Sequence, residues 1–87
     1  LSDKIANKAN DLSGGQKQIL AIAMILQKPT RILLLDEPTA ALDEKNAHLV
    51  MQYLREITKS QNITVLIITH DPALVKTYAN DIYFEIQ

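Results

Sequence analysis

Apolar residues along the chain follow two alternating patterns, one typical of helices and one of buried strands. Three helices are predicted at positions where a polar residue can cap the first turn: about 13–27, 43–60 and a short one from 71. Ser13 with Gln16 three residues later matches a capping box, and Pro29 ends that helix because the residue before a proline avoids helical geometry. In the second helix, apolar residues recur every three to four positions, as in an amphipathic helix. Its stripe comprises Val50, Tyr53, Leu54 and Ile57.

Three short apolar segments lie between or after these helices. They are Arg31–Asp36, Ile63–Thr69 and Asp81–Ile86. The first two are continuously apolar or β-branched, which predicts strands buried on both faces, as in a parallel sheet. Strands that alternate with helices indicate an α/β fold with parallel strands. A chain of 87 residues is expected to form one domain or part of one.

Composition narrows the class of protein only slightly. The net charge is −1 and the basic residues are scattered, so no basic stripe for nucleic acid is visible and no direct nucleic-acid contact is expected. The chain lacks cysteine, which excludes disulfides and metal sites with thiolate ligands. The longest apolar run, Ile19–Leu26, has eight residues, whereas a bilayer span needs about 20. The polypeptide is therefore expected to be soluble or peripheral to a membrane.

Leu12–Gln16 reads LSGGQ at the start of the first predicted helix. A helix N-terminus offers free N–H groups and a partial positive charge, and glycines let a phosphate approach the backbone. The Ser13 hydroxyl can add a hydrogen bond. Taken alone, the same residues are better explained by a glycine-containing turn that starts a helix.

Two carboxylates end the first predicted strand, at the edge where α/β sheets bind ligands. Asp36 suits Mg²⁺, a hard ion that accepts few carboxylates and keeps its waters. Glu37 could orient or deprotonate an attacking water. A solvated acidic turn before Pro38 is the alternative explanation.

His70 follows the second buried strand and would share that edge with Asp36 if the strands are parallel. There it could bond a γ-phosphate and the attacking water; a packed or capping histidine is the alternative. His48 lies within the second helix and is interpreted as a surface histidine.

Together these motifs resemble those of the ATP-binding cassette (ABC) ATPases. The signature is LSGGQ at 12–16, the Walker B stretch is ILLLDEPT at 32–39, the D-loop is Ala40–Asp43, and the switch histidine is His70. Order and spacing match over essentially all 87 residues. Because the only glycines are Gly14 and Gly15, the Walker A motif GxxxxGK[ST] does not occur in the sequence. The resemblance therefore implies a partial P-loop NTPase core, with residues 1–87 as the C-terminal part of one nucleotide-binding domain.

The resemblance also implies ATP and Mg²⁺ as cofactors and a second cassette as partner in a head-to-tail dimer. Ser13, Gly14, Gly15 and Gln16 would then contact the ATP of the partner, and Asp43 would couple the two sites. Asp36 would hold Mg²⁺, while Glu37 and His70 would catalyse hydrolysis of ATP bound by their own cassette. In the family's sheet the Walker A strand separates the histidine strand from the last one, so its absence leaves a gap between 63–69 and 81–86, which either closes or exposes a long apolar edge. The isolated chain is expected to be inactive.

Ile19 and Met24 stand where many family members have basic residues, which puts the usual salt bridges of this helix in doubt. LSGGQ with Asp-Glu-Pro-Thr looks more like transporter cassettes than chromosome-maintenance or DNA-repair relatives. The resemblance thus implies the ATPase subunit of an ABC transporter, bound to transmembrane subunits at the cytoplasmic face of a membrane. A non-transport ABC ATPase acting on nucleic acid or ribosomes, or a module that works only with a partner cassette, remains the alternative.

Overall fold

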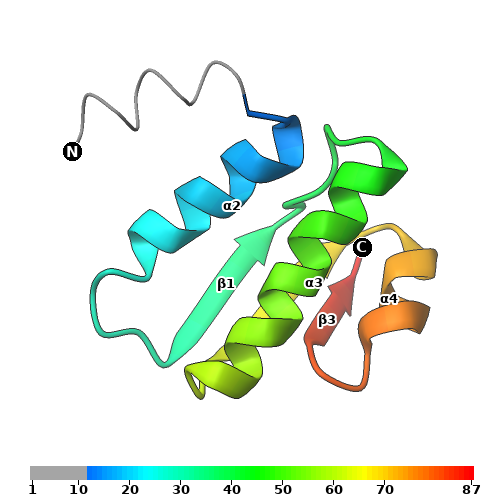
Figure 1. Cartoon of the computed structure of the whole chain (residues 1–87). Helices are drawn as coiled ribbons and strands as arrows, with labels where there is room; N and C mark the ends of the chain where they lie inside the picture. Colours follow the sequence, from blue (N-terminus) through cyan, green and yellow to red (C-terminus); the bar gives the residue numbers. More distant parts are fainter. Residues whose placement is uncertain (1–11) are drawn as a thin grey trace.

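The computed structural model describes residues 12–87, which form a two-layer α/β unit (Figure 1). The first eleven residues of the predicted domain lie outside the described part. In chain order the elements are α2 (Gly14–Ile25), β1 (Ile32–Asp36), α3 (Glu44–Ser60), β2 (Thr64–Thr69), α4 (Pro72–Tyr78) and β3 (Tyr83–Ile86). Every predicted helix and strand is present, each within two residues of its predicted limits. None of the helices in residues 12–87 is long and apolar enough to cross a membrane.

The sheet is parallel, with strand order β1-β2-β3. Its register aligns Leu34 with Leu66 and Leu66 with Tyr83. The predicted parallel α/β fold is therefore confirmed. Of the two outcomes expected for the gap between the second and third strands, closure is the one observed, because β2 and β3 pair directly over four residue pairs. The central strand β2 thus pairs on both sides with strands that the chain itself supplies.

The helix starts follow the capping chemistry that the sequence predicts. The Ser13 hydroxyl accepts from the Gln16 N–H at 3.1 Å, and the Gln16 carboxamide accepts from the Ser13 N–H at 3.0 Å. Asp43 caps α3, and Asp71 caps α4 with Pro72 at its first position. Helix α2 ends at Ile25, two residues before the predicted end, and a turn leads to Pro29.

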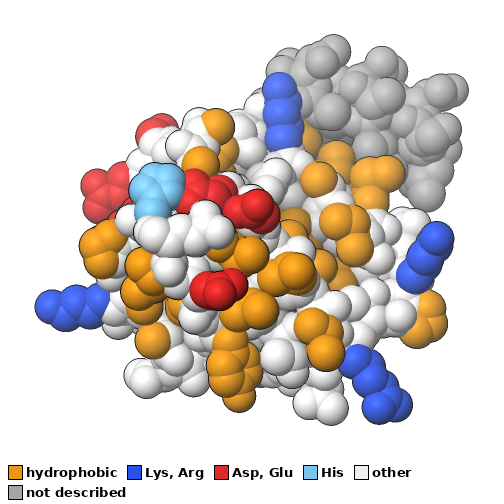
Figure 2. Space-filling view, turned by 180° about the vertical axis from the view of Figure 1, so that it is seen from behind, with side chains coloured by type: hydrophobic (Ala, Val, Ile, Leu, Met, Phe, Trp, Pro, Cys, Tyr) orange, Lys and Arg blue, Asp and Glu red, His pale blue; other side chains and the backbone are white. Residues whose placement is uncertain are grey.

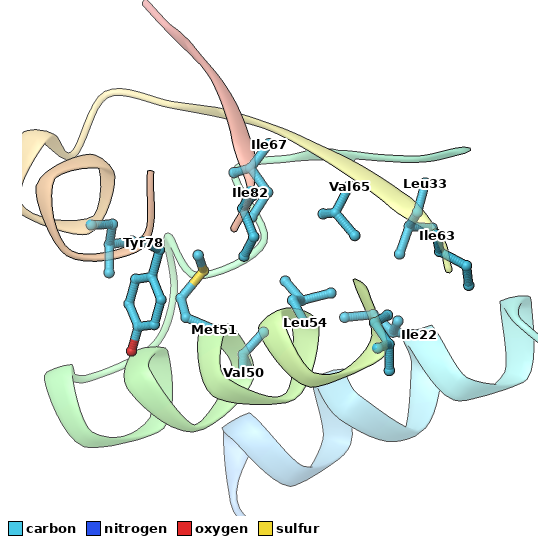
Figure 3. Close-up of a cluster of buried hydrophobic side chains, with 12 residues drawn as sticks. Ile22, Leu33, Val50, Met51, Leu54, Ile63, Val65, Ile67, Tyr78 and Ile82 are labelled. Carbon is cyan, nitrogen blue, oxygen red and sulfur yellow. The ribbon is translucent and has the colours of Figure 1, made fainter. Parts of the chain in front are cut away.

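One apolar core lies between the helices and the sheet (Figure 3). The α3 stripe is confirmed, with Val50, Leu54 and Ile57 buried and Tyr53 packed at the margin. Met51 extends this stripe, while Leu33, Val65 and Ile67 face it from the sheet. Burial of these side chains, each contributing roughly 1.5–3 kcal/mol, fixes the strands against α3. The carboxyl ends of β1 and β2 are thereby held at one edge.

The opposite face of the sheet is open within residues 12–87, so the prediction of strands buried on both faces is wrong for this part of the chain. Burial alternates along β1, where Ile32 is 69% exposed and Leu34 59% exposed. Tyr83, aligned with Leu34 through Leu66, is 68% exposed. Apolar side chains accordingly cover much of the face seen from behind in Figure 2. The physical reason is topological: α2, α3 and α4 all lie on one side of the sheet.

His48 is not a free surface histidine. It is half-buried, and its Nδ1 lies 2.7 Å from the hydroxyl of Tyr78. The Tyr78 ring is buried, and the Arg55 guanidinium lies 5.3 Å from the ring centre. These contacts attach α4 to α3 immediately downstream of His70. The helical position of His48 gave no indication of this contact, because Tyr78 lies thirty residues away in sequence.

Tyr78→Phe is expected to lower the free energy of unfolding by about 0.5–1.5 kcal/mol at neutral pH, since it removes this hydrogen bond. Burial raises the pKa of Tyr78 above its ordinary value of 10.0, and Arg55 offsets part of that rise. A raised pKa means that the contribution is complete below pH 10 and is lost as pH rises through the folded-state value. Urea unfolding at neutral pH and above pH 10 should show less alkaline loss in the Tyr78→Phe variant.

Tyr83→Phe is the matched control for that measurement, because Tyr83 is exposed on the open face. It should leave both the neutral stability and the alkaline loss nearly unchanged. An unaltered alkaline loss in the Tyr78→Phe variant would contradict the assignment to Tyr78.

Candidate active site

Glu37 and His70 meet at the carboxyl ends of the neighbouring strands β1 and β2. The Oε1 of Glu37 and the Nδ1 of His70 are 2.5 Å apart. The parallel register produces this meeting, since Asp36 aligns with Ile68, and Glu37 and His70 each follow within two positions. The His70 side chain is 70% exposed and that of Glu37 is 24% exposed. The carboxylate is thus held within the edge, while the imidazole is free to contact a ligand.

Glu37 has an unusual backbone conformation, with φ of 51°. This left-handed region costs a non-glycine residue about 1–2 kcal/mol. The Glu37 N–H donates to the Ile68 carbonyl at 2.7 Å, which continues the strand pairing and holds the residue in place. The turn directs the Glu37 side chain toward β2 and His70. Sequence patterns gave no sign of this strain.

A hollow of about 690 Å³ opens beside this pair. Among its lining residues are Glu37, Thr69, His70, Asp71, Glu44 and His48. Asp36 is not among them: it shares the strand face of Ile32 and Leu34 and is exposed. In residues 12–87, no three His, Asp or Glu side chains gather as a metal-binding group. The structure therefore brings Glu37 and His70 together and places Asp36 on the other side of β1.

The signature residues form a separate cluster with the start of α3. Gly15 is buried, and its N–H donates to the Asn46 Oδ1 at 3.0 Å. A Cβ at Gly15 would lie 2.9 Å from the Asn46 carbonyl oxygen, and one at Gly14 would lie 2.9 Å from the Leu42 Cδ2. Close packing of α2 on α3 thus needs glycine at position 15, whatever ligand the helix start binds. The sequence reasoning missed this structural role and Asn46.

Asp43 belongs to the same cluster. Its Oδ1 accepts from the Asn46 N–H at 2.8 Å and from the Asn46 Nδ2 at 2.9 Å. These hydrogen bonds hold the pKa of Asp43 below its usual value, so the carboxylate is favoured. Asp43, Asn46, Ser13 and Gln16 line a second hollow, and His48 lines both hollows. The predicted site residues therefore fall into two neighbouring clusters.

The arrangement supports proton and phosphate chemistry at one cluster and backbone contacts at the other. A carboxylate bonded to an imidazole can orient and deprotonate water, and the exposed imidazole can donate to an anionic oxygen. Acidic side chains gather around a histidine at one end of the face in Figure 2.

The sequence is similar to those of known proteins and matches one protein-family model. Residues 3–85 match the model described as "RecF/RecN/SMC N terminal domain". The chain is 42% identical over 82 residues to a phosphonates import ATP-binding protein of Halalkalibacterium halodurans, covering 94% of this chain and 32% of that protein. It is 44% identical over 79 residues to its counterpart from Bdellovibrio bacteriovorus, covering 91% and 30%. A methionine import ATP-binding protein of Streptococcus agalactiae is 42% identical over 80 residues, covering 92% and 22%.

The chain spans about a third or less of the length of these curated relatives. No solved structure matches it. The homologues are ATP-binding proteins of ABC transporters, which agrees with the resemblance drawn from the four motifs. With 83 of its 87 residues within the matched model, the chain belongs to the RecF/RecN/SMC N-terminal domain family and has ABC transporter ATP-binding proteins among its homologues.

Proposed function

We propose that residues 1–87 are the C-terminal part of an ABC nucleotide-binding domain, which hydrolyses ATP to drive transport across a membrane. The observation that carries the proposal is the Glu37–His70 pair at the carboxyl ends of adjacent parallel strands. In such sheets this edge is the place where ligands bind. Homologues that are ATP-binding subunits of importers support the same function.

Glu37 acts in this proposal as the base that orients and deprotonates the attacking water. His70 accepts or donates through its Nδ1 to Glu37 and contacts the γ-phosphate from the same strand edge. Positioning of this kind supplies most of the catalysis in phosphoryl transfer, because the transition state is stabilised mainly by fixed charges and hydrogen bonds. The hollow beside the pair gives water and phosphate access to both side chains.

Asp36 fits the Mg²⁺ that ATP hydrolysis requires. Its carboxylate is exposed and lies at the strand end, and Mg²⁺ is commonly held by one or two carboxylates together with waters and phosphates. When bound, the ion would neutralise charge that develops on the phosphates. The three acidic or histidine groups that an all-protein metal cage needs are not gathered within residues 12–87, and this mode of binding does not require them.

Ser13, Gly14, Gly15 and Gln16 serve in trans, at the nucleotide of a second cassette, and Asp43 couples the two sites across the dimer. Ser13 and the exposed residues Gly14 and Gln16 present the start of α2 to a partner. The two clusters line different hollows, which share only the margin at His48, and this supports two different nucleotides for them. The dimer binds transmembrane subunits at the cytoplasmic face of a membrane.

The proposal is tested by measuring phosphate release from Mg-ATP by the cassette that contains this segment. Release that depends on dimerisation is expected. A cassette that binds no ATP and releases no phosphate would overturn the function.

The 87-residue chain alone is expected to bind ATP weakly or not at all. It contains no GxxxxGK[ST] sequence, whose backbone amides and lysine supply most phosphate contacts. Titration of a labelled ATP analogue with Mg²⁺ measures this directly, with a complete cassette of an importer relative as the positive control. Micromolar binding by the pure chain would contradict the expectation.

A second candidate is an ABC-class ATPase that acts on nucleic acid. The match to the RecF/RecN/SMC model favours it, whereas the net charge of −1 and the scattered basic residues do not. Stimulation of hydrolysis by DNA in the complete cassette separates this candidate from the transporter subunit, for which no stimulation is expected.

A further inference from the structure

Asn46 joins two segments that lie far apart in sequence. Its side-chain oxygen accepts from the Gly15 N–H at 3.0 Å, and its side-chain nitrogen donates to the Asp43 Oδ1 at 2.9 Å. One carboxamide therefore touches both the first turn of α2 and the residue that caps α3. No other side chain in residues 12–87 hydrogen-bonds both of these segments.

We propose that Asn46 is a positioning residue that makes the start of α2 and the Asp43 carboxylate move as one unit. This inference rests on the proposed function, in which the start of α2 contacts the nucleotide of a second cassette and Asp43 couples the two sites. A phosphate oxygen that takes the Gly15 N–H must displace the Asn46 oxygen. The displaced carboxamide then reorients, and its hydrogen bond to Asp43 changes with it.

The geometry gives this link little freedom. Gly15 is buried, and the Asn46 backbone carbonyl lies only 2.9 Å from where a Cβ of Gly15 would stand. Asp43 is held from two directions by Asn46, through the backbone N–H and through Nδ2. Removal of the Nδ2 donor therefore loosens Asp43 without removing its cap on α3. The lowered pKa of Asp43, caused by these two hydrogen bonds, reports the state of the link.

Two substitutions separate the halves of the link. Asn46→Asp keeps an acceptor for Gly15 but loses the donor to Asp43 and places a second carboxylate beside it. A carboxylate in the first turn of α3 is itself favourable to the helix, so this variant should fold. Asn46→Leu keeps the branched shape and loses both hydrogen bonds. Gln52→Glu, on the same hollow, adds a carboxylate to α3 and serves as the charge control.

NMR on the 87-residue chain measures the link without any nucleotide. Asn46→Asp is expected to raise the pKa of Asp43 and keep the Gly15 amide protected from exchange. Asn46→Leu is expected to raise that pKa. It should also speed exchange of the Gly15 amide proton roughly two- to tenfold, which corresponds to the free energy of one hydrogen bond. Gln52→Glu should change neither. An unchanged Asp43 pKa in Asn46→Asp, or unchanged Gly15 exchange in Asn46→Leu, would overturn the proposal.

A second measurement in the complete cassette distinguishes failure of the link from failure of the proposed function. Asn46→Asp should lower hydrolysis while each cassette still binds its own ATP at the wild-type level, because in this proposal Asn46 responds to the nucleotide of the second cassette. Equal hydrolysis in the Asn46→Asp variant and the wild type would overturn the coupling role. Absence of hydrolysis in the wild-type cassette would instead reject the proposed function and leave the NMR result on Asn46 standing.

Discussion

Glu37→Gln is expected to abolish steady-state ATP hydrolysis by the complete cassette while ATP-dependent dimerisation persists. Glutamine has the shape of glutamate and can still hydrogen-bond the Nδ1 of His70, which lies 2.5 Å from the Glu37 oxygen. It cannot accept a proton from water, and loss of a general base typically costs about 10²–10⁴ in rate. Phosphate release and size-exclusion chromatography in Mg-ATP measure the two effects on the same sample.

Glu44→Gln is the matched control, because Glu44 lines the same hollow from the first turn of α3. It removes the same charge at an exposed position without touching His70, and hydrolysis should remain near the wild-type rate. Equal losses in both variants would assign the effect to the net charge of the hollow. Loss of dimerisation in the Glu37→Gln variant would argue against a role as base and for a role in nucleotide binding.

Gly15→Ala is expected to lower the free energy of unfolding by about 1–3 kcal/mol, the range for forcing an extra methyl group into a packed site. The new Cβ would lie 2.7 Å from the Asn46 Oδ1 and 2.9 Å from the Asn46 backbone oxygen. The backbone oxygen belongs to α3 and cannot move without shifting the helix, so α2 must separate from α3. Urea unfolding monitored by circular dichroism measures the loss.

Gly14→Ala provides the comparison for this result. Its Cβ would lie 2.9 Å from the Leu42 Cδ2, the far end of a flexible side chain that can rotate away. Alanine also favours a helix more than glycine does by roughly 1 kcal/mol, which offsets part of the contact. The Gly14→Ala variant should therefore lose clearly less stability than the Gly15→Ala variant. Equal losses would show that the crowding at Asn46 does not decide the result.

Local chemistry explains which parts of the fold could be predicted. Capping residues such as Ser13, Asp43 and Asp71 act on the backbone within a few positions, so the helix starts agree closely with the sequence. The Glu37–His70 meeting also follows from two strand ends, once the strands are parallel. A strand's burial on its second face depends on which elements pack there, and the open face of β1 shows that an apolar run alone does not determine it.

The contacts of Asn46 and His48 could not be predicted from the sequence, because their partners are distant along the chain. Each side chain bonds a residue far along the chain, Gly15 or Tyr78, and helical spacing carries no information about such a partner. Gly15 was interpreted by what a phosphate or a turn that starts a helix would need, although close helix packing requires the same residue. Access for a phosphate and close helix packing both require glycine at position 15. The sequence does not distinguish the two requirements, and the packing becomes visible only in the structure.

The left-handed backbone of Glu37 sets the catalytic role proposed for this residue against its conformational preference. At a φ of 51°, glycine would be free of the steric penalty that glutamate carries. The surrounding sheet must supply that free energy through contacts such as the Glu37 N–H to the Ile68 carbonyl. The carboxylate at this edge is therefore held against the conformational preference of its own main chain, a cost that is common at functional sites.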